Sequence, residues 1–316
     1  MRTLYLLLKT ARPRQWIKNM SLFAALVFSG FFFYDPADAP PYAVTVSVAF
    51  VVFSLLTSAI YIGNDIIDLP ADKQHPFKKK RPIASGELPI PTAVVAGLAL
   101  LIVVIVASLS MPVFFRLSLL FYTLLQVAYS TWLKHIPILD ISAIATGFLV
   151  RVYAGAFVVN LHMSVWFLLT VISVSLFLAV GKRQSERTLL EGRKDVTLGS
   201  TRKILRHYSQ RLLDQFTAMF ATATWLTYAL FTFQTENSSP DESLAGVYTI
   251  LPRTLQSQKL LMITIPLVIF GVMRYLQLVY EKNQGESPDR VLLGDAPLLI
   301  TVFLFGVLTM IVIYAV

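Results

Sequence analysis

The feature that most constrains this chain is a series of apolar runs, each near the length of a membrane-spanning helix. Crossing the hydrocarbon core takes roughly 20 mostly apolar residues, and about nine runs of that size occur in the 316 residues. Because these runs are continuously apolar rather than alternating, they predict helices and not barrel strands. The predicted spans are 20–34, 42–62, 91–109, 112–132, 137–159, 163–181, 209–234, 257–280 and 295–316.

The composition agrees with this prediction. Hydrophobic residues make up 56% of the chain and charged residues 14%, whereas soluble domains carry about 25% charged residues. An ordinary soluble enzyme is thereby excluded, and the absence of cysteine excludes disulfides and thiol catalysis. The sequence predicts an all-α polytopic membrane protein, with residues 1–316 forming a single transmembrane catalytic domain.

The distribution of cations predicts the orientation. Most of the 27 Lys and Arg residues fall in the N-terminal segment and in the loops after every second span. The positive-inside rule places those segments in the cytoplasm. The protein is thus predicted to lie in the cell (inner) membrane with its N-terminus in the cytoplasm. After nine spans, its C-terminus lies on the outer side. Because sidedness explains the net charge of +9, no nucleic-acid partner is predicted. The long cytoplasmic loops 63–90 and 182–208 are predicted to carry active-site residues.

An acidic cluster stands at the cytoplasmic end of the second span. Asp65, Asp68 and Asp72 follow one another at helical spacing, with Asn64 beside them. Carboxylate oxygens are ligands that Mg²⁺ prefers, together with water and substrate phosphate oxygens. A solvated acidic helix end is the alternative, but unpaired carboxylates beside hydrocarbon are costly. The cluster therefore predicts a magnesium–phosphate site, with the position of Asp72 weakened by Pro70, which blocks a regular helix.

Basic residues follow the acidic cluster and recur at the same membrane depth. They are typical of a solvated positive-inside loop, but a metal-bound diphosphate also needs cations on its remaining oxygens. His75 is a weaker candidate, and Arg151, inside the fifth span, is either a phosphate ligand or half of a structural ion pair with Asp140. Arg14 and Lys18 belong to an amphipathic entry segment with Trp16, which is typical of an interfacial helix. The substrate-binding candidates of these segments are Lys78, Arg81, Tyr129, Lys134, Asp140, Arg151, Lys182, Arg183, Arg14 and Lys18, with the cations as candidate phosphate ligands. Together these groups predict a polar cavity open to the cytoplasm.

Several of these segments carry a family resemblance. Asn64-Asp65-xx-Asp68-xxx-Asp72, Arg81-Pro82-xx-Ser85-Gly86 and Tyr129-xxxx-Lys134 resemble the UbiA-type membrane prenyltransferase superfamily. Further segments resemble one branch of it, the decaprenyl-phosphate phosphoribosyltransferases; they are Arg12-Pro-Arg14-Gln-Trp16-Ile-Lys18-Asn19, Gly147-Phe-Leu-Val-Arg151, Gly181-Lys182-Arg183 with Glu186, Arg274-Tyr275, and 285–298. Aromatic prenyltransferases of the superfamily carry a second DxxxD motif, whereas here Asp140 is followed at i+4 by Ile144.

The resemblance implies a donor, an acceptor and a set of roles. The donor would be phosphoribosyl diphosphate and the acceptor a polyprenyl phosphate lipid such as decaprenyl phosphate. The enzyme would be embedded in the lipid bilayer, where a homo-oligomer is compatible with the resemblance. Mg²⁺ would bind Asp65, Asp68 and Asp72, with Lys134 and Tyr129 also catalytic and Asn64 supporting. Two alternatives remain open: a prenyltransferase that uses an allylic diphosphate and an aromatic acceptor, and a transporter of an anionic metabolite.

Overall fold

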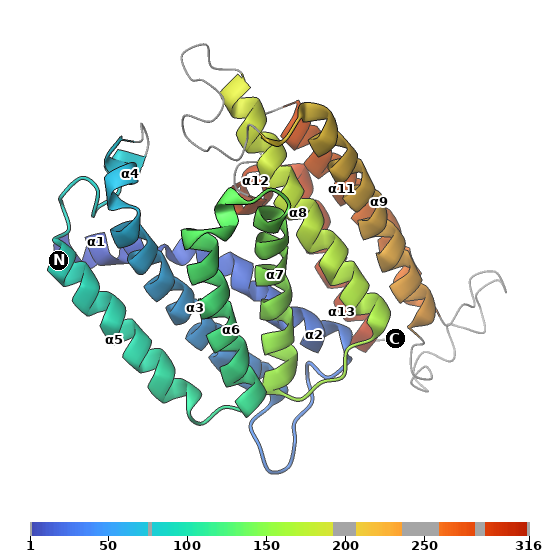
Figure 1. The fold of residues 1–316 in the computed structure, drawn as a ribbon. Coiled ribbons are helices and arrows are strands. Elements are labelled where there is room, and N and C mark those ends of the chain that lie inside the picture. Colours follow the sequence, from blue (N-terminus) through green and yellow to red (C-terminus); the bar gives the residue numbers. More distant parts are fainter. Residues whose placement is uncertain (1, 75–77, 192–206, 236–258, 282–287, 315–316) are drawn as a thin grey trace. The chain divides into compact units, whose positions relative to one another are not determined.

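The protein is all-helical in the part that the computed structural model describes, which comprises residues 2–74, 78–191, 207–235, 259–281 and 288–314 (Figure 1). Eight helical segments there are long and apolar enough to cross a membrane, which confirms the prediction of a polytopic membrane protein. They comprise α3 (Tyr42–Ile67), α5 (Ile90–Ser108), α6 (Val113–Thr131), α7 (Leu139–Val158), α8 (Val165–Glu191), α9 (Gln210–Gln234), η5 (Leu260–Thr264) continuing into α11 (Ile265–Tyr280), and α13 (Ala296–Tyr314).

The predicted first span, 20–34, is wrong in its bounds. The chain instead forms a 3₁₀ helix, η1 (Pro13–Leu22), which passes into the short α-helix α2 (Phe23–Phe28). A turn follows, in which Gly30 has φ of 79°, a left-handed conformation that glycine adopts without steric cost. The apolar run at 20–34 therefore reflects the end of a helical segment that begins earlier, in the amphipathic residues. His75 and much of the loops 182–208 and 235–256 lie outside the described residues.

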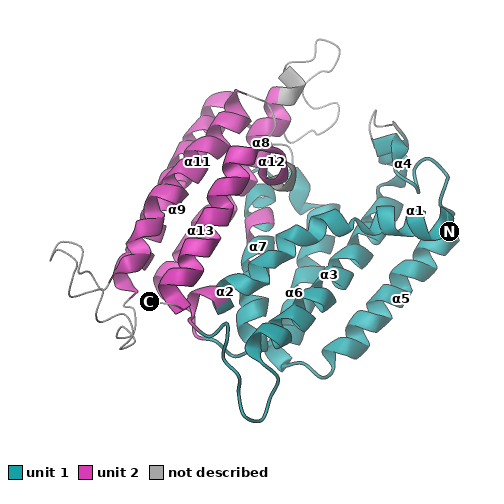
Figure 2. Cartoon of the chain, turned by 180° about the vertical axis from the view of Figure 1, so that it is seen from behind, with its two compact units in different colours: residues 1–26, 31–143, 147–161 teal, residues 27–30, 144–146, 162–316 magenta. Residues whose placement is uncertain are grey.

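Two compact units make up the chain, one formed by residues 1–26, 31–143 and 147–161 and the other by residues 27–30, 144–146 and 162–316 (Figure 2). In the first unit α3 packs against α5, α6, η1 and the N-terminal helix α1 (Arg2–Ala11). Its core includes Phe53, Leu56, Phe115 and Tyr122. The α1 side chain Leu6 packs with Ile62, Ile83 and Leu88 at the end of α3 that carries the aspartates. This packing fixes the segment after α3 close to α1.

A glycine sets the distance between η1 and α7 within the first unit. A Cβ added to Gly155 would collide with the backbone carbonyl group of Leu22. We expect Gly155→Ala to lower the free energy of unfolding by about 2 kcal/mol, because backbone atoms cannot move aside as a side chain can. Gly306→Ala is the matched control, since a Cβ at Gly306 meets nothing within 4 Å. Thermal unfolding of both variants in the same detergent tests this; equal midpoints would contradict the close packing.

The second unit contains α8, α9, α11, α13 and the short α12 (Pro288–Gly294). Its core includes Phe177, Tyr275, Leu278 and Leu298. Asp295 precedes α13 and accepts two hydrogen bonds from Arg274, at 3.0 and 2.7 Å, and one from the backbone N–H of Leu298 at 3.0 Å. This carboxylate caps α13 and, through its ion pair with Arg274, ties α13 to α11.

Candidate active site

The acidic residues lie where α3 ends and the chain changes direction. Asp65 is in the last turn of α3, Asp68 is the residue after the helix, and Asp72 belongs to the separate short helix α4 (Leu69–Gln74). Pro70 lies in the first turn of α4, where a missing N–H costs no helical hydrogen bond. Their spacing along the chain suggested one face of a single regular helix. The structure instead divides the three carboxylates between the end of α3 and a separate helix.

Asp65 and Asp72 form one charged cluster with two arginines. Both carboxylates are buried, with 3% and 2% of their surface exposed. The guanidinium of Arg81 donates to Asp65 at 3.0 Å and to Asp72 at 2.5 Å, through the same Nη1 nitrogen. Arg12 donates to the same oxygen of Asp65, Oδ1. Lys78, in η2 (Lys78–Lys80), lies 3.9 Å from Asp72. We call Arg12, Asp65, Asp72 and Arg81 the acid–base cluster.

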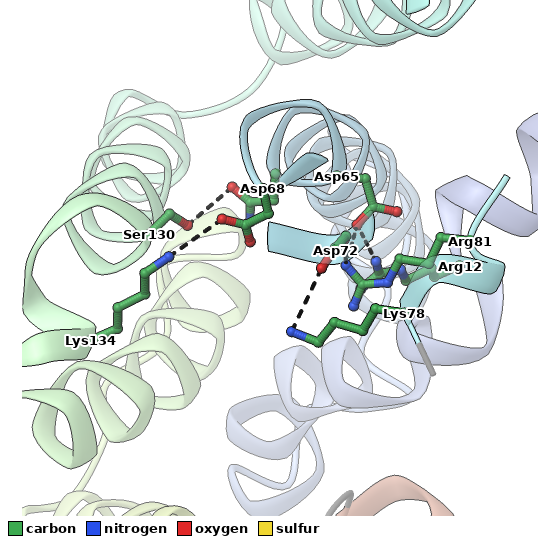
Figure 3. Close-up of polar contacts among 9 residues, drawn as sticks. Arg12, Asp65, Asp68, Asp72, Lys78, Arg81, Ser130 and Lys134 are labelled. Carbon is green, nitrogen blue, oxygen red and sulfur yellow. Dashed lines mark hydrogen bonds and ion pairs between the residues drawn. The ribbon is translucent and has the colours of Figure 1, made fainter. Parts of the chain in front are cut away.

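Asp68 faces a different neighbour. Figure 3 shows its side chain turned toward Lys134, which lies in the short 3₁₀ helix η3 (Leu133–His135) after α6, at 3.5 Å between Nζ and Oδ1. Asn64 accepts a hydrogen bond from Ser130 of α6 at 3.0 Å. The end of α6 is thus joined to the end of α3 by two polar contacts. The predicted candidates that come together around the end of α3 are Asp65, Asp68, Asp72, Lys78, Arg81 and Lys134 (Figure 3), and Asn64 joins them through its hydrogen bond with Ser130.

The donor set of the acid–base cluster fits a divalent cation with part of its coordination left to a substrate. An oxygen of Asp65 and one of Asp72 both contact a single cationic nitrogen, so a positive charge between them is already accommodated. Mg²⁺ is commonly held by one or two carboxylates plus phosphate oxygens and waters. Among the described residues no group of three acidic or histidine side chains is arranged as a metal site, so Asp68 would have to leave Lys134 to join the other two.

Arg12 and Ser130 are members of the site that the sequence did not single out. Arg12 lies between α1 and η1 with φ of 54° and ψ of 57°, a left-handed backbone conformation that is uncommon for arginine. Its guanidinium also lies over the ring of Tyr61, 5.0 Å from the centroid. The cation pattern in 12–18 was visible, but nothing local indicated which cation reaches Asp65.

Other predicted candidates of the first unit lie elsewhere. Arg151 is 5% exposed within α7, where its nitrogens donate to Asn19, to the carbonyl of Gly147 and to the hydroxyl of Tyr122. Its hydrogen bonds among the described residues therefore do not include Asp140, the ion-pair partner in one of the two alternatives, which is buried in the first turn of α7. Arg14 is exposed and Lys18 half-buried on η1, and Tyr129 is half-buried on α6 beside Ser130.

The candidates of the second unit lie at the C-terminal part of α8. Lys182 is half-buried there, and Arg183 is fully buried and donates to Glu186 at 2.5 Å. One turn of α8 is also tied to its neighbours through Asp214 of α9, which accepts hydrogen bonds from Gln184 at 3.0 Å and from Tyr280 of α11 at 2.8 Å. The second unit thus has its own polar layer in which Lys182 and Arg183 are held.

Apolar spanning helices and a carboxylate–guanidinium cluster at the end of one of them define an integral membrane protein with a charged site. Residues 21–283 match the model of the UbiA prenyltransferase family. Because this match covers most of the sequence, the chain belongs to the UbiA prenyltransferase family, and the expected membership is confirmed.

The chain is similar to several curated proteins. It is 34% identical over 296 residues to the decaprenyl-phosphate phosphoribosyltransferase of Corynebacterium glutamicum, which covers 92% of this chain and 81% of that protein. It is 39% identical over 236 residues to the protein of the same name from Mycolicibacterium smegmatis, covering 74% and 72% of the two chains. Among solved structures, a UbiA homolog from Archaeoglobus fulgidus bound to GPP and Mg²⁺ matches with a TM-score of 0.64 and 18% identity over 98% and 99% of the two chains, which shows the fold.

Proposed function

We propose that this protein is a Mg²⁺-dependent membrane transferase that moves the 5-phosphoribosyl group from phosphoribosyl diphosphate to decaprenyl phosphate and releases diphosphate. The product, a polyprenyl phosphoribose, would serve as a precursor of cell-envelope arabinose. The proposal is supported by the curated relatives at 34% and 39% identity, which carry the name decaprenyl-phosphate phosphoribosyltransferase. It also rests on the chain's membership in the UbiA prenyltransferase family and on its eight candidate membrane spans.

The acid–base cluster is the observation that carries the proposal. Its buried carboxylates supply oxygen ligands, and Arg12, Arg81 and Lys78 supply cations within the same few ångströms. A diphosphate bound with a divalent cation needs both kinds of partner at once. When bound by Asp65, Asp72 and, after it leaves Lys134, Asp68, Mg²⁺ would neutralise negative charge on the leaving diphosphate.

The side chains of this site account for the rest of the leaving-group chemistry. Cleavage of the C1–O bond builds negative charge on the diphosphate, which Arg81 and Lys78 would meet by exchanging part of their contact with Asp72 for phosphate oxygens. Lys134 and Tyr129 would approach the diphosphate from the end of α6. The side chain of Asn64 is oriented by the hydrogen bond that it accepts from Ser130. Lys182, Arg183, Lys18 and Arg14 are further proposed phosphate ligands.

The acceptor does not require a general base. The phosphate of decaprenyl phosphate is already anionic at neutral pH, so its oxygen attacks the anomeric carbon without first losing a proton, and a single displacement inverts that carbon. This is consistent with a site built from carboxylates and fixed cations. The polyprenyl tail would lie along apolar helix surface, and the polar cavity proposed for the head groups would open to the cytoplasm.

A prenyltransferase acting on an allylic diphosphate is the second candidate, favoured by the fold likeness to a solved homolog bound to GPP. The missing carboxylate at Ile144 disfavours it. The test is diphosphate release by purified protein with Mg²⁺, given either phosphoribosyl diphosphate with decaprenyl phosphate or geranyl diphosphate with an aromatic acceptor. Release with the first pair only is the expected result, and release with the second pair only would sink the proposal.

Removal of divalent metal is expected to abolish turnover reversibly. Asp65 and Asp72 would then keep their arginine partners, so the fold should persist while the substrate diphosphate loses its main counter-charge. The measurement is turnover after excess EDTA, followed by Mg²⁺ titration. Recovery of at least about 90% of the initial rate on adding Mg²⁺ is expected, since an ion bound at substrate-facing positions exchanges readily; full activity in EDTA would contradict a metal-dependent mechanism.

The orientation in the membrane is also a proposal, with the N-terminus cytoplasmic and the C-terminus outside. It requires a ninth crossing besides the eight candidate spans. At 2.0 Å per residue for 3₁₀ helix and 1.5 Å for α-helix, η1 and α2 would extend roughly 29 Å, near the thickness of the hydrocarbon core. Since the chain lacks cysteine, a single cysteine added at the C-terminus and probed with an impermeant thiol reagent on intact cells tests this. Labelling only after lysis would refute it.

A further inference from the structure

The 3₁₀ helix η1 is unusual in length and needs an explanation. It runs for ten residues, Pro13–Leu22, whereas 3₁₀ runs beyond three or four residues are uncommon because their hydrogen bonds are poorly aligned. Measured from Asn19, a 3₁₀ helix places residue 12 roughly 3.5 Å farther along the axis than an α-helix would. The form of η1 therefore decides where Arg12, at its N-terminal boundary, lies relative to Asp65.

Two side chains of η1 form hydrogen bonds with side chains of other helices. Asn19, 1% exposed, donates to the hydroxyls of Ser54 and Thr57 on α3 at 3.0 and 3.3 Å. Its carbonyl oxygen accepts a hydrogen bond from Nε of Arg151 on α7 at 2.8 Å. Trp16 donates to Ser58 of α3 at 2.9 Å. These bonds connect one 3₁₀ helix to two spanning helices at fixed points along its length.

Arg151 is itself held in place by neutral partners. Its Nη1 and Nη2 donate to the carbonyl of Gly147 and the hydroxyl of Tyr122, both at 2.6 Å. Its guanidinium lies over the ring of Tyr122, 4.8 Å from the centroid, and near the rings of Phe148 and Phe53 at 5.5 and 5.8 Å. A buried charge with such partners is costly to displace. At 5% exposure it is enclosed by protein rather than presented to a substrate.

We propose that Asn19 and Arg151 are positioning residues that hold η1 in its 3₁₀ form and thereby place Arg12 on Asp65. Neither side chain touches substrate; both act through Arg12. This inference rests on the proposed function, because it assumes that the acid–base cluster binds the diphosphate of the donor. It gives Arg151 a positioning role in place of the phosphate contact that its sequence position suggested.

A double-mutant cycle between Asn19 and Arg12 tests the proposal. Asn19→Ala and Arg12→Ala should each raise KM for phosphoribosyl diphosphate about tenfold or more, with a smaller change in kcat, since each removes hydrogen bonds that keep a cation on the diphosphate site. The KM of the double variant should differ by no more than about twofold from that of the single variant with the higher KM. The reason is that Asn19 has nothing to position once Arg12 is lost. A merely structural role would instead give effects that multiply.

Two further variants keep the test decisive if Asn19→Ala does not fold. Ser54→Ala combined with Thr57→Val removes the hydroxyl partners of Asn19 on α3 while leaving Asn19 itself, and should raise KM in the same direction. Ser118→Ala is the matched control, because the buried hydroxyl of Ser118 donates within its own helix, to the carbonyl of Phe115 at 2.6 Å, and has no other hydrogen bond among the described residues. It should leave KM unchanged.

The same cycle has a readout that does not need transferase activity. The Kd of inorganic diphosphate in the presence of Mg²⁺, measured by calorimetry on the purified full chain, should rise in the single variants and show the same non-additivity. If the parent binds magnesium diphosphate but transfers no phosphoribosyl group, the proposed function fails while the positioning role stands. Multiplicative effects in both readouts, or a parent-like Kd in Asn19→Ala, would overturn the positioning role.

Discussion

Replacing Asp65 by asparagine is expected to lower turnover by at least about 10³-fold, the scale of losing a central electrostatic group in a catalytic site. Asp65 is 3% exposed and accepts hydrogen bonds from both Arg12 and Arg81. The amide keeps the shape of the side chain but loses the negative charge that would bind Mg²⁺ and offset two guanidinium groups. The loss should appear in kcat as well as in KM for the donor, since a metal held by Asp65 would neutralise the charge that develops on the leaving group.

Asp295→Asn is the matched control for this variant. Asp295 is also a buried carboxylate with an arginine partner, Arg274, but it caps α13 and is not a member of the acid–base cluster. We expect Asp295→Asn to lower thermal stability while turnover per folded molecule stays within about threefold of the parent, because its charge serves a helix cap and an ion pair with Arg274. Turnover of Asp65→Asn within tenfold of the parent, with expression intact, would remove Asp65 from the metal site.

Arg81→Met is expected to lower kcat/KM by about 10²-fold, mainly through a higher KM for phosphoribosyl diphosphate. One nitrogen of Arg81 joins Asp65 to Asp72, and with 26% of its side chain exposed the guanidinium remains accessible to a ligand. Its loss would leave Lys78, at 3.9 Å, as the ion-pair partner of Asp72 within the described chain. We therefore also expect a loss of folding free energy on the order of 2 kcal/mol.

Two companion variants separate charge from geometry at position 81. Arg81→Lys keeps the charge but not the planar fork, so its kcat/KM should fall between those of the parent and Arg81→Met. Arg116→Met, in the first turn of α6 and at the opposite end of that helix from Ser130, should leave kcat/KM unchanged. Steady-state kinetics in both substrates checks these outcomes, and a parent-like KM for the donor in Arg81→Met would show that Arg81 does not hold diphosphate.

The positions of the spanning helices could be predicted from the sequence because their apolar runs are continuous. Several runs are also bounded by prolines, such as Pro41 before α3 and Pro112 before α6. For the first span the sequence indicated an amphipathic entry segment, but neither the end of the helix at Phe28 nor the 3₁₀ conformation of Pro13–Leu22. Apolar periodicity reports which residues face lipid, but it does not distinguish a 3₁₀ helix that is fixed by polar contacts to other helices.

The candidate site was predictable in its members more than in its arrangement. The aspartates, Arg81 and Lys134 were chosen by residue type and order along the chain, and the structure brings them to one end of α3. The division that places Asp68 with Lys134, apart from the acid–base cluster, arises because α3 ends at Ile67 and α4 begins at Leu69. Arg12 could not be chosen over Arg14 or Lys18, because its direction depends on a left-handed backbone residue and on packing far along the sequence.

Phosphoribosyl transfer to a lipid phosphate at the acid–base cluster can be measured directly. The purified protein, in liposomes with Mg²⁺, is incubated with phosphoribosyl diphosphate labelled in the ribose and with decaprenyl phosphate. We expect label in the organic extract at the mass of decaprenyl-phosphoryl-5-phosphoribose with the parent, and none above background with Asp65→Asn. Absence of labelled lipid with the parent, under conditions in which the Corynebacterium glutamicum relative forms it, would show that the protein does not carry out this transfer.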